Sequence, residues 1–216
     1  HQRVKRVDYP TRTIKFVVPF PSGSGTDQAA REAANDITRR TGQPVIVENK
    51  PGANGLIAAQ QVARAAPDGY TVFITSMTTQ SVNPFLYKKL PYDPVADFIP
   101  VAMISKTAMV LVVRNTEDQP KSVAELTARM QAAGSKLSFA SGNTSSLVAG
   151  KTYSNAVSSP ALHVPYKGNP QAVTDLMAGA VDFMFSDLTV ANPLVQQGRL
   201  RGLGVTGPTR ASTLPD

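Results

Sequence analysis

The fold class is indicated most strongly by Ile14-Lys15-Phe16-Val17-Val18-Pro19-Phe20, followed at once by Pro21-Ser22-Gly23-Ser24-Gly25-Thr26. The first run is β-branched and aromatic, as in a buried strand, and the second is a tight turn rich in glycine and hydroxyl groups. Asp27 then stands where a helix N-cap is expected, and alanines recur on one helical face until Gly42 supplies a stop. Strand, loop and helix form half of a βαβ unit.

The same order of strand, polar loop and helix continues along the chain. Further strands are predicted at residues 45–48, 70–75, 99–104, 109–113, 137–140, 162–166, 181–185 and 200–205. Helix starts between them are marked by the capping box Ser122-x-x-Glu125 and by Asn169-Pro170. Strands that alternate with single helices favour parallel sheets, with ligands beyond the carboxyl ends of the strands. The sequence therefore predicts an α/β fold, and a connector rich in proline and tyrosine at 90–94 predicts passage into a second lobe.

Composition narrows the classes of function. Of the 216 residues 42% are apolar, enough for a substantial core, and the longest apolar runs fall far short of the roughly 20 residues that cross a bilayer. The absence of cysteine excludes disulfides, thiolate nucleophiles and cysteine metal sites. The net charge of +7 is compatible with nucleic acid, an anionic surface or an anionic ligand. Because the basic residues are scattered and no nucleic-acid motif is found, attraction of small anions is the favoured interpretation.

The loop from Ser22 to Asp27 is the first candidate binding site. A turn rich in glycine and hydroxyl groups that enters a helix leaves unpaired N–H groups pointing outward, and the helix N-terminus adds a partial positive charge. Such a loop suits an anion. Taken alone, it is explained at least as well as a tight turn in which Asp27 caps its own helix.

A second loop of the same kind, Ser141-Gly142-Asn143-Thr144-Ser145-Ser146, enters a later helix. Two facing helix termini could clamp one or two carboxylates between them, although a solvated serine-rich loop would have the same composition. Asp187 follows a predicted strand, where it could accept a hydrogen bond from a ligand or cap the next helix.

Two motifs imitate nucleotide-binding loops. Gly23-Ser24-Gly25-Thr26-Asp27-Gln28 approaches a dinucleotide fingerprint with Glu48 as a ribose ligand, but Gln28 replaces the third glycine and Asp27 would face the pyrophosphate. Gly150-Lys151-Thr152 resembles the end of a P-loop but lies inside a predicted helix.

Catalysis and metal binding find little support. His163 is the only internal histidine, and its place in a short apolar strand favours a structural role. No serine lies in a nucleophile motif, and no cluster of His and Cys offers metal ligands. No catalytic residue, metal or cofactor is therefore predicted.

Motifs at specific intervals run through nearly the whole chain. They are Val17-Val18-Pro19-Phe20-Pro21-Ser22-Gly23-x-x-x-Asp27, Gly42-Gln43-Pro44-Val45, Glu48-Asn49-Lys50-Pro51-Gly52-Ala53, Ala66-Pro67-Asp68-Gly69-Tyr70, Asn83-Pro84-x-Leu86-Tyr87, Leu90-Pro91-Tyr92-Asp93-Pro94, His163-Val164-Pro165-Tyr166-Lys167-Gly168 and Leu214-Pro215-Asp216. In this combination the sequence resembles the Bug family, the periplasmic solute receptors of tripartite tricarboxylate transporters.

That resemblance implies a periplasmic-binding-protein-like Venus flytrap of two α/β lobes with mainly parallel sheets. Lobe 1 is expected at residues 1–104, lobe 2 at 105–208, and the start of a crossover back to lobe 1 at 209–216. The implied ligand is a small carboxylate, such as a di- or tricarboxylate, an acidic amino acid or an aromatic acid, on which the protein performs no chemistry. The implied ligand-binding residues, in the two loops and at the rim, are Ser22, Gly23, Ser24, Thr26, Asp27, Ser76, Thr78, Ser141, Gly142, Asn143, Thr144, Ser145, Lys167 and Asp187.

The resemblance also sets expectations for partners and location. The expected partners are the anionic ligand and the membrane components of the transporter, with no nucleic acid, and the expected location is the periplasm. Residues His1 to Arg6 contain no apolar segment, so for an exported protein we expect the signal peptide to have been removed. The rival functions are a dinucleotide-dependent enzyme and the effector domain of a transcriptional regulator, which would need a helix-turn-helix that this sequence lacks.

Two departures from the family pattern matter. Ser24 replaces a glycine that the family usually has, which restricts the backbone and adds a hydroxyl. Relatives continue beyond Leu214-Pro215-Asp216 with a segment that completes the first lobe, so a C-terminal part is expected to be missing. We expect a monomer whose first lobe exposes apolar surface, or chain exchange if the missing segment reflects a true truncation.

Overall fold

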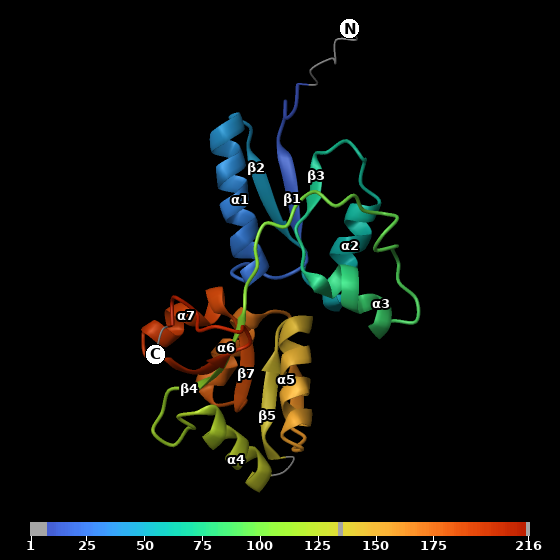
Figure 1. Cartoon of the computed structure of the whole chain (residues 1–216). Helices are drawn as coiled ribbons and strands as arrows, with labels where there is room; N and C mark the ends of the chain where they lie inside the picture. Colours follow the sequence, from blue (N-terminus) through green and yellow to red (C-terminus); the bar gives the residue numbers. More distant parts are fainter. Residues whose placement is uncertain (1–7, 134–135, 215–216) are drawn as a thin grey trace.

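The computed structural model describes residues 8–133 and 136–214 of the chain. Within them the chain forms two α/β lobes, each built around its own β-sheet (Figure 1). We call the part built on the amino-terminal sheet the first lobe and the other part the second lobe. None of the helices in the described ranges is both long and apolar enough to span a membrane.

The first lobe is built on three parallel strands in the order β2-β1-β3. These are β1 (Ile14–Val18), β2 (Val45–Asn49) and β3 (Thr71–Phe73). The central strand β1 buries four of its five side chains, which explains why its β-branched and aromatic run gave so clear a signal. Helices α1 (Gly25–Thr41) and α2 (Leu56–Ala63) lie on opposite sides of this sheet, as Figure 1 shows.

Short helical turns complete the first lobe at the edge that faces the second. The 3-10 turn η1 (Ala53–Gly55) precedes α2, and the π-helical turn η2 (Thr78–Val82) continues into α3 (Asn83–Leu86). Both turns follow the carboxyl ends of strands, where an α/β fold places its binding loops.

The second lobe has five strands in the order β6-β5-β7-β4-β8. Its strands are β4 (Met109–Arg114), β5 (Ser138–Ser141), β6 (Leu162–Pro165), β7 (Phe183–Asp187) and β8 (Leu200–Val205). Its helices are α4 (Val123–Ala133), α5 (Thr144–Ala156), α6 (Asn169–Ala178) and α7 (Leu188–Gln196). Separate apolar clusters fill the two faces of this sheet.

Strand β4 makes this second sheet mixed. β5 runs parallel to β6 and β7, whereas β4 is antiparallel to both β7 and β8. Met109, where β4 begins, pairs with Asp187, where β7 ends, so the chain enters the second lobe at the carboxyl edge of the parallel strands. A strand that starts at that edge must run antiparallel. The expectation of mainly parallel sheets is confirmed for the fold as a whole, with this local exception.

The prediction of a strand at residues 99–104 was wrong. This segment is a loop that runs past the first lobe toward β4 (Figure 1), and Ile99 and Val101 are 87% and 84% exposed. Its apolar, β-branched composition favours a strand only where a neighbouring strand supplies hydrogen bonds and packing. Along this loop the chain exposes apolar side chains, as expected from the sequence.

The prediction that Asp27 caps helix α1 was also wrong. The N-cap is Ser24, whose backbone is extended and whose Oγ accepts a hydrogen bond from the Asp27 N–H at 3.3 Å. Asp27 lies in the first turn of the helix instead, and its carboxylate is therefore free to bond elsewhere.

Candidate ligand-binding site between the lobes

The two lobes touch where the loop between β1 and α1 meets the starts of α6 and α7. A Cβ placed on Gly168 would lie 2.3 Å from Cγ of Pro21, and one placed on Gly25 would lie 3.1 Å from Cγ of Asp187. Gly142, which precedes α5, packs equally closely on the backbone of Asn169. The beginnings of several helices therefore converge on one region between the lobes.

A cavity of about 180 Å³ lies in this region. The first lobe contributes residues from the end of β1, from the turn before α2 and from η2, and the second contributes the starts of α5 and α6. The lining residues are Pro19, Phe20, Gly52, Ala53, Asn54, Gly55, Thr78, Gly142, Asn143 and Lys167. Glycine backbone, two side-chain amides, a hydroxyl and one ammonium group therefore surround the cavity.

The turn Gly52–Gly55 forms a strained wall of this cavity. Its four residues all have positive φ, and for Ala53 (48°) and Asn54 (50°) this conformation costs about 1–2 kcal/mol each. Two independent features require glycine at position 55. Its φ is 82°, which other residues rarely adopt, and a Cβ there would lie 2.6 Å from Cγ2 of Thr79. Backbone strain of this kind collects at binding sites.

The cavity wall of the second lobe is held by a network around Asp187. Asn143 caps α5 through its Oδ1, which accepts from the Ser146 N–H at 2.8 Å, while its Nδ2 donates to Oδ2 of Asp187 at 3.2 Å. Asn169 donates to the same oxygen at 2.9 Å, and its own Oδ1 accepts from the Gly142 N–H at 3.0 Å. Asp187 therefore lies behind both Asn143 and Gly142, two residues that line the cavity.

Burial governs the protonation of Asp187. Desolvation raises the pKa of its carboxyl above 3.8, although hydrogen bonds from Asn169, Asn143 and the Gly25 backbone N–H offset part of the rise. Asp187 occupies the N-cap position of α7, but its side chain makes no capping bond there. Of the two roles considered from the sequence, helix capping is therefore excluded.

In the Ser22 to Asp27 loop, the N–H groups of Gly23, Ser24 and Asp27 donate within the loop's own turn. Asp27 is 1% exposed, and its Oδ2 accepts from the Gly23 N–H at 2.8 Å and from Nε of Arg31 at 3.0 Å. Its Oδ1 accepts from Nδ2 of Asn49 at 2.8 Å. Burial opposes ionisation, but the bonds from Arg31, Gly23 and Asn49 outweigh it and lower the pKa of Asp27 below 3.8. The loop rests against the second lobe, and none of its residues is among those that line the cavity.

The other predicted residues divide between the cavity and its supports. Thr78, Gly142, Asn143 and Lys167 line the cavity. Ser76 stands behind it, since its Oγ donates to Oγ1 of Thr78 at 3.2 Å. Thr144 and Ser145 form the first turn of α5.

Ser141 and His163 form a supporting pair in the second lobe. The Oγ of Ser141 lies 2.7 Å from Nε2 of His163, and the imidazole ring packs 5.0 Å from the ring of Phe139. Burial, and then the charge of Lys151, lower the pKa of His163 below 6.5. His163 thus holds β5 and β6 together, in keeping with the structural role favoured from its sequence.

Sequence reasoning missed more than half of the lining. Pro19, Phe20 and the turn Gly52–Gly55 were not proposed as binding residues. The available signal was that this turn follows the second predicted strand, so it belongs to the same rim as the loop after the first.

The two nucleotide-like motifs have structural explanations. Glu48 is paired with Nζ of Lys15 at 2.9 Å and of Lys50 at 3.3 Å, so its carboxylate is already engaged. Gly150 lies inside α5, where a Cβ would come within 2.4 Å of the Phe139 ring. Packing against β5, rather than phosphate binding, requires that glycine.

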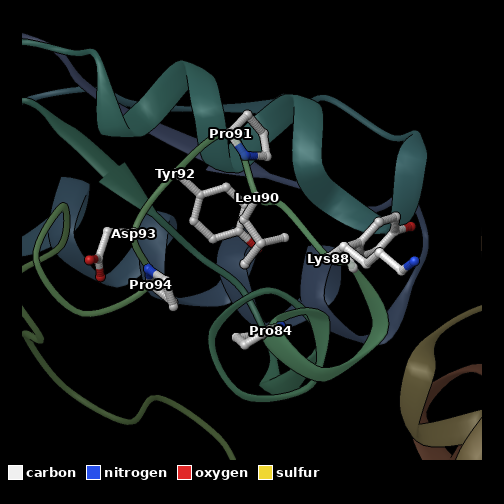
Figure 2. A pocket seen from close by; sticks show the side chains of 8 residues that line it. Pro84, Lys88, Leu90, Pro91, Tyr92, Asp93 and Pro94 are labelled. Carbon is white, nitrogen blue, oxygen red and sulfur yellow. The ribbon is translucent and has the colours of Figure 1, made fainter.

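A broader depression of about 540 Å³ lies on the first lobe alone (Figure 2). Figure 2 shows Lys88 and Asp93 at opposite ends, with the Tyr92 ring between them. Tyr92 is 6% exposed and its hydroxyl donates to the Thr79 carbonyl oxygen at 2.6 Å, so it serves the interior of the lobe. This depression is lined by residues of one lobe only, whereas the interlobe cavity joins loops of both lobes and is the stronger candidate site.

Known proteins resemble this chain over most of its length. The model of the tripartite tricarboxylate transporter family receptor matches residues 29–216. The UPF0065 protein of the tcbD-tcbE intergenic region of Pseudomonas sp. (strain P51) is 37% identical over 99% of this chain and 64% of its own length. Protein BugT of Bordetella pertussis is 32% identical over 96% of this chain and 64% of BugT. The chain thus spans less than two thirds of the length of these curated relatives.

Solved structures agree with the fold. A Rhodopseudomonas palustris protein with adipate is 32% identical with a TM-score of 0.91, over 94% of this chain and 68% of that one. MatC from the same organism, with bound malate, is 30% identical with a TM-score of 0.87, over 96% and 71% of the two chains. The periplasmic binding protein BugD is 32% identical with a TM-score of 0.83, over 96% and 70%. With the match to the family model, these similarities show that the chain belongs to the tripartite tricarboxylate transporter receptor family, TctC.

Proposed function

We propose that this chain forms the ligand-binding lobes of a periplasmic receptor that captures a small carboxylate in the interlobe cavity. The receptor delivers its ligand to the membrane components of a tripartite tricarboxylate-type transporter and performs no chemistry on it. In this proposal residues 1–104 form lobe 1, 105–208 form lobe 2, and 209–216 begin a return to lobe 1; residues 1–7, 134–135 and 215–216 of these ranges lie outside the described part of the chain.

The charge of the cavity carries the proposal. Among the described residues that line it, Lys167 is the only charged one, so the cavity favours an anion. The side-chain amides of Asn54 and Asn143 and the hydroxyl of Thr78 add hydrogen-bonding groups. Charge-assisted hydrogen bonds to a carboxylate contribute roughly 1.5–3 kcal/mol each. A few of them supply most of the about 8 kcal/mol that micromolar binding requires.

The size of the cavity limits the ligand. Its volume of about 180 Å³ is below the roughly 300–1,000 Å³ of sites for drug-sized ligands, so it suits an acid of a few carbon atoms. Adipate and malate, bound by two relatives, are acids of this class. This agreement favours a receptor over the dinucleotide-dependent enzyme and the effector domain considered from the sequence.

Isothermal titration calorimetry with malate, adipate, citrate, glutamate and benzoate tests the proposal. At least one of these acids is expected to bind with micromolar affinity, and adipamide, the uncharged diamide of adipate, is expected to bind far more weakly. The bound acid should be recovered unchanged by mass spectrometry after incubation, and NAD should give no heat. Protein that is folded by circular dichroism yet binds none of the acids would contradict the proposal.

A further inference from the structure

The side chain of Asp187 makes a close contact between the two lobes. Its carboxylate belongs to β7 of the second lobe, yet it reaches the first residue of α1 in the first lobe. A Cβ on Gly25 would lie 3.1 Å from both Cγ and Oδ2 of Asp187 and 3.1 Å from Oγ1 of Thr189. No larger residue than glycine fits there without displacing Asp187, so the contact depends on the small size of Gly25.

The chemistry of this contact is favourable. Gly25 is the first residue of the 17-residue helix α1, whose N-terminus carries a partial positive charge and unpaired N–H groups. The Asp187 carboxylate lies against the backbone of Gly25, and the backbone N–H of Gly25 is among the groups that favour the charged form of Asp187. An acidic side chain of the second lobe thus occupies the helix terminus of the first, where the sequence suggested that a ligand carboxylate would bind.

The same carboxylate also shapes the cavity. Oδ2 of Asp187 accepts from Asn143, which lines the cavity, and from Asn169, which in turn accepts from the N–H of Gly142 in the cavity wall. A movement of Asp187 away from α1 would therefore disturb both lining residues. The carboxylate of Asp187 therefore takes part both in the contact between the lobes and in the hydrogen bonds that hold the cavity wall.

We propose that Asp187 is a positioning residue that couples lobe closure to the interlobe cavity, because its carboxylate contacts the start of α1 and also accepts hydrogen bonds from the side chains of Asn143 and Asn169. In the absence of ligand this contact favours the closed arrangement of the lobes. With ligand present, it keeps the second-lobe wall in the orientation that receives the acid. The second statement rests on the proposed function, whereas the first does not.

Distance measurements on the ligand-free protein test the coupling directly. Because the chain has no cysteine, spin labels can be attached only at introduced cysteines. Labels at Asn35→Cys on α1 and Ala128→Cys on α4, two exposed positions, measure the distance between the lobes. The parent protein is expected to give one narrow distance distribution. Asp187→Asn removes the carboxylate, and Gly25→Val displaces it from the first lobe while leaving Asn143 and Asn169 in place. Both variants are expected to shift the distribution to longer, broader distances.

A matched control separates this role from general destabilisation. Asp175 is another second-lobe carboxylate, which accepts from the Tyr166 hydroxyl at 2.6 Å within that lobe, so Asp175→Asn should leave the distances unchanged. If either Asp187→Asn or Gly25→Val keeps the parental distribution while folded, the proposal is wrong. If Asp187→Asn does not fold, Gly25→Val decides the question alone.

Calorimetry with malate and adipate extends the test to binding. Asp187→Asn is expected to weaken the tighter of the two by about 10- to 100-fold, since a charge-assisted network is lost, and Asp175→Asn to leave it unchanged. An unchanged affinity in Asp187→Asn would overturn the coupling to the cavity. If the parent protein binds neither acid, the proposed function fails, but the distance measurement still decides whether Asp187 holds the lobes together.

Discussion

Gly168 of the second lobe lies so close to Pro21 of the first that a Cβ on Gly168 would sit 2.3 Å from Cγ and 2.7 Å from Cδ of the proline ring. The backbone of Gly168 is extended, with φ at −169°, a conformation that any residue adopts. The glycine is therefore required by the contact between the lobes and not by its own dihedral angles.

Substitution of this glycine should open the lobes. Gly168→Ala introduces a clash that only movement of Pro21 can relieve, and we expect carboxylate affinity to fall about tenfold or more in calorimetry. Gly202→Ala, whose Cβ would lie 3.4 Å from Val110 within the second lobe, is the matched control and should bind normally. Equal affinities in the two variants would show that the lobes do not close on the ligand as proposed.

Lys167 should set the preference for anions. Lys167→Met keeps the length of the side chain and removes the charge, so we expect dicarboxylate affinity to fall about 5- to 30-fold, with a smaller loss at high salt because Lys167 is exposed. Lys88→Met alters the depression of Figure 2 instead and should change affinity little. A similar loss in both variants would point to a general effect of net charge rather than a contact in the cavity.

The strained turn should make Gly55 unusually sensitive. Gly55→Ala combines a φ of 82° with close contacts to Thr79 and Pro19, and we expect the free energy of unfolding to fall by about 2–4 kcal/mol. Gly42→Ala is a matched control, because φ is 74° but no atom lies within 4 Å of the added Cβ, and it should cost only about 1 kcal/mol. Urea unfolding followed by circular dichroism measures both, and equal losses would mean that packing around Gly55 adds nothing.

Asp27 should contribute to acid sensitivity. Its folded pKa lies below the usual 3.8, so its stabilising contribution is complete above pH 3.8 and is lost as the pH falls through the lowered folded value. The free energy of unfolding of the parent protein, measured with urea, should fall steeply as the pH drops below 3.8. The free energy of unfolding of Asp27→Asn should fall less steeply over the same range. If the free energies of unfolding of the two proteins changed in parallel with pH, Asp27 would not have the lowered pKa in the folded state.

Asp187 should act with the opposite sign. Burial raises its folded pKa above 3.8, so the folded state takes up a proton, and the resulting stabilisation is complete below pH 3.8 and lost as the pH rises through the raised value. The free energy of unfolding of the parent protein, relative to that of Asp187→Asn, should therefore decline as the pH rises across this window. A difference that stays constant with pH would show that Asp187 titrates normally.

The strands and helix starts could be predicted because their signals are local. The apolar run at Ile14–Val18 is a buried central strand, and the Ser122 and Glu125 capping signal is realised by the Glu125 N–H, which donates to Oγ of Ser122 at 3.1 Å. The failed prediction at residues 99–104 shows the limit of such signals, since a strand also needs a neighbour that no local pattern supplies.

The candidate site could be predicted only in part. Lys167, Asn143 and Thr78 were proposed from the family resemblance and line the cavity, whereas in the Ser22 to Asp27 loop the N–H of Gly23 donates to Asp27. A glycine- and hydroxyl-rich loop looks the same in sequence whether its N–H groups face a ligand or its own carboxylate. The missing information was where Arg31 and Asn49 would lie relative to Asp27.

The sequence alone determined the α/β class, the family and most of the order of strands and helices, because hydrophobic periodicity, caps and motifs act over a few neighbouring residues. Only the tertiary structure decided which loops surround the cavity and which groups Asp187 contacts. Its partners Asn169 and Asn143 are 18 and 44 positions away, and Gly25 belongs to the other lobe. Such contacts depend on the relative position of the two lobes, each packed around its own sheet, and no local sequence pattern specifies that position.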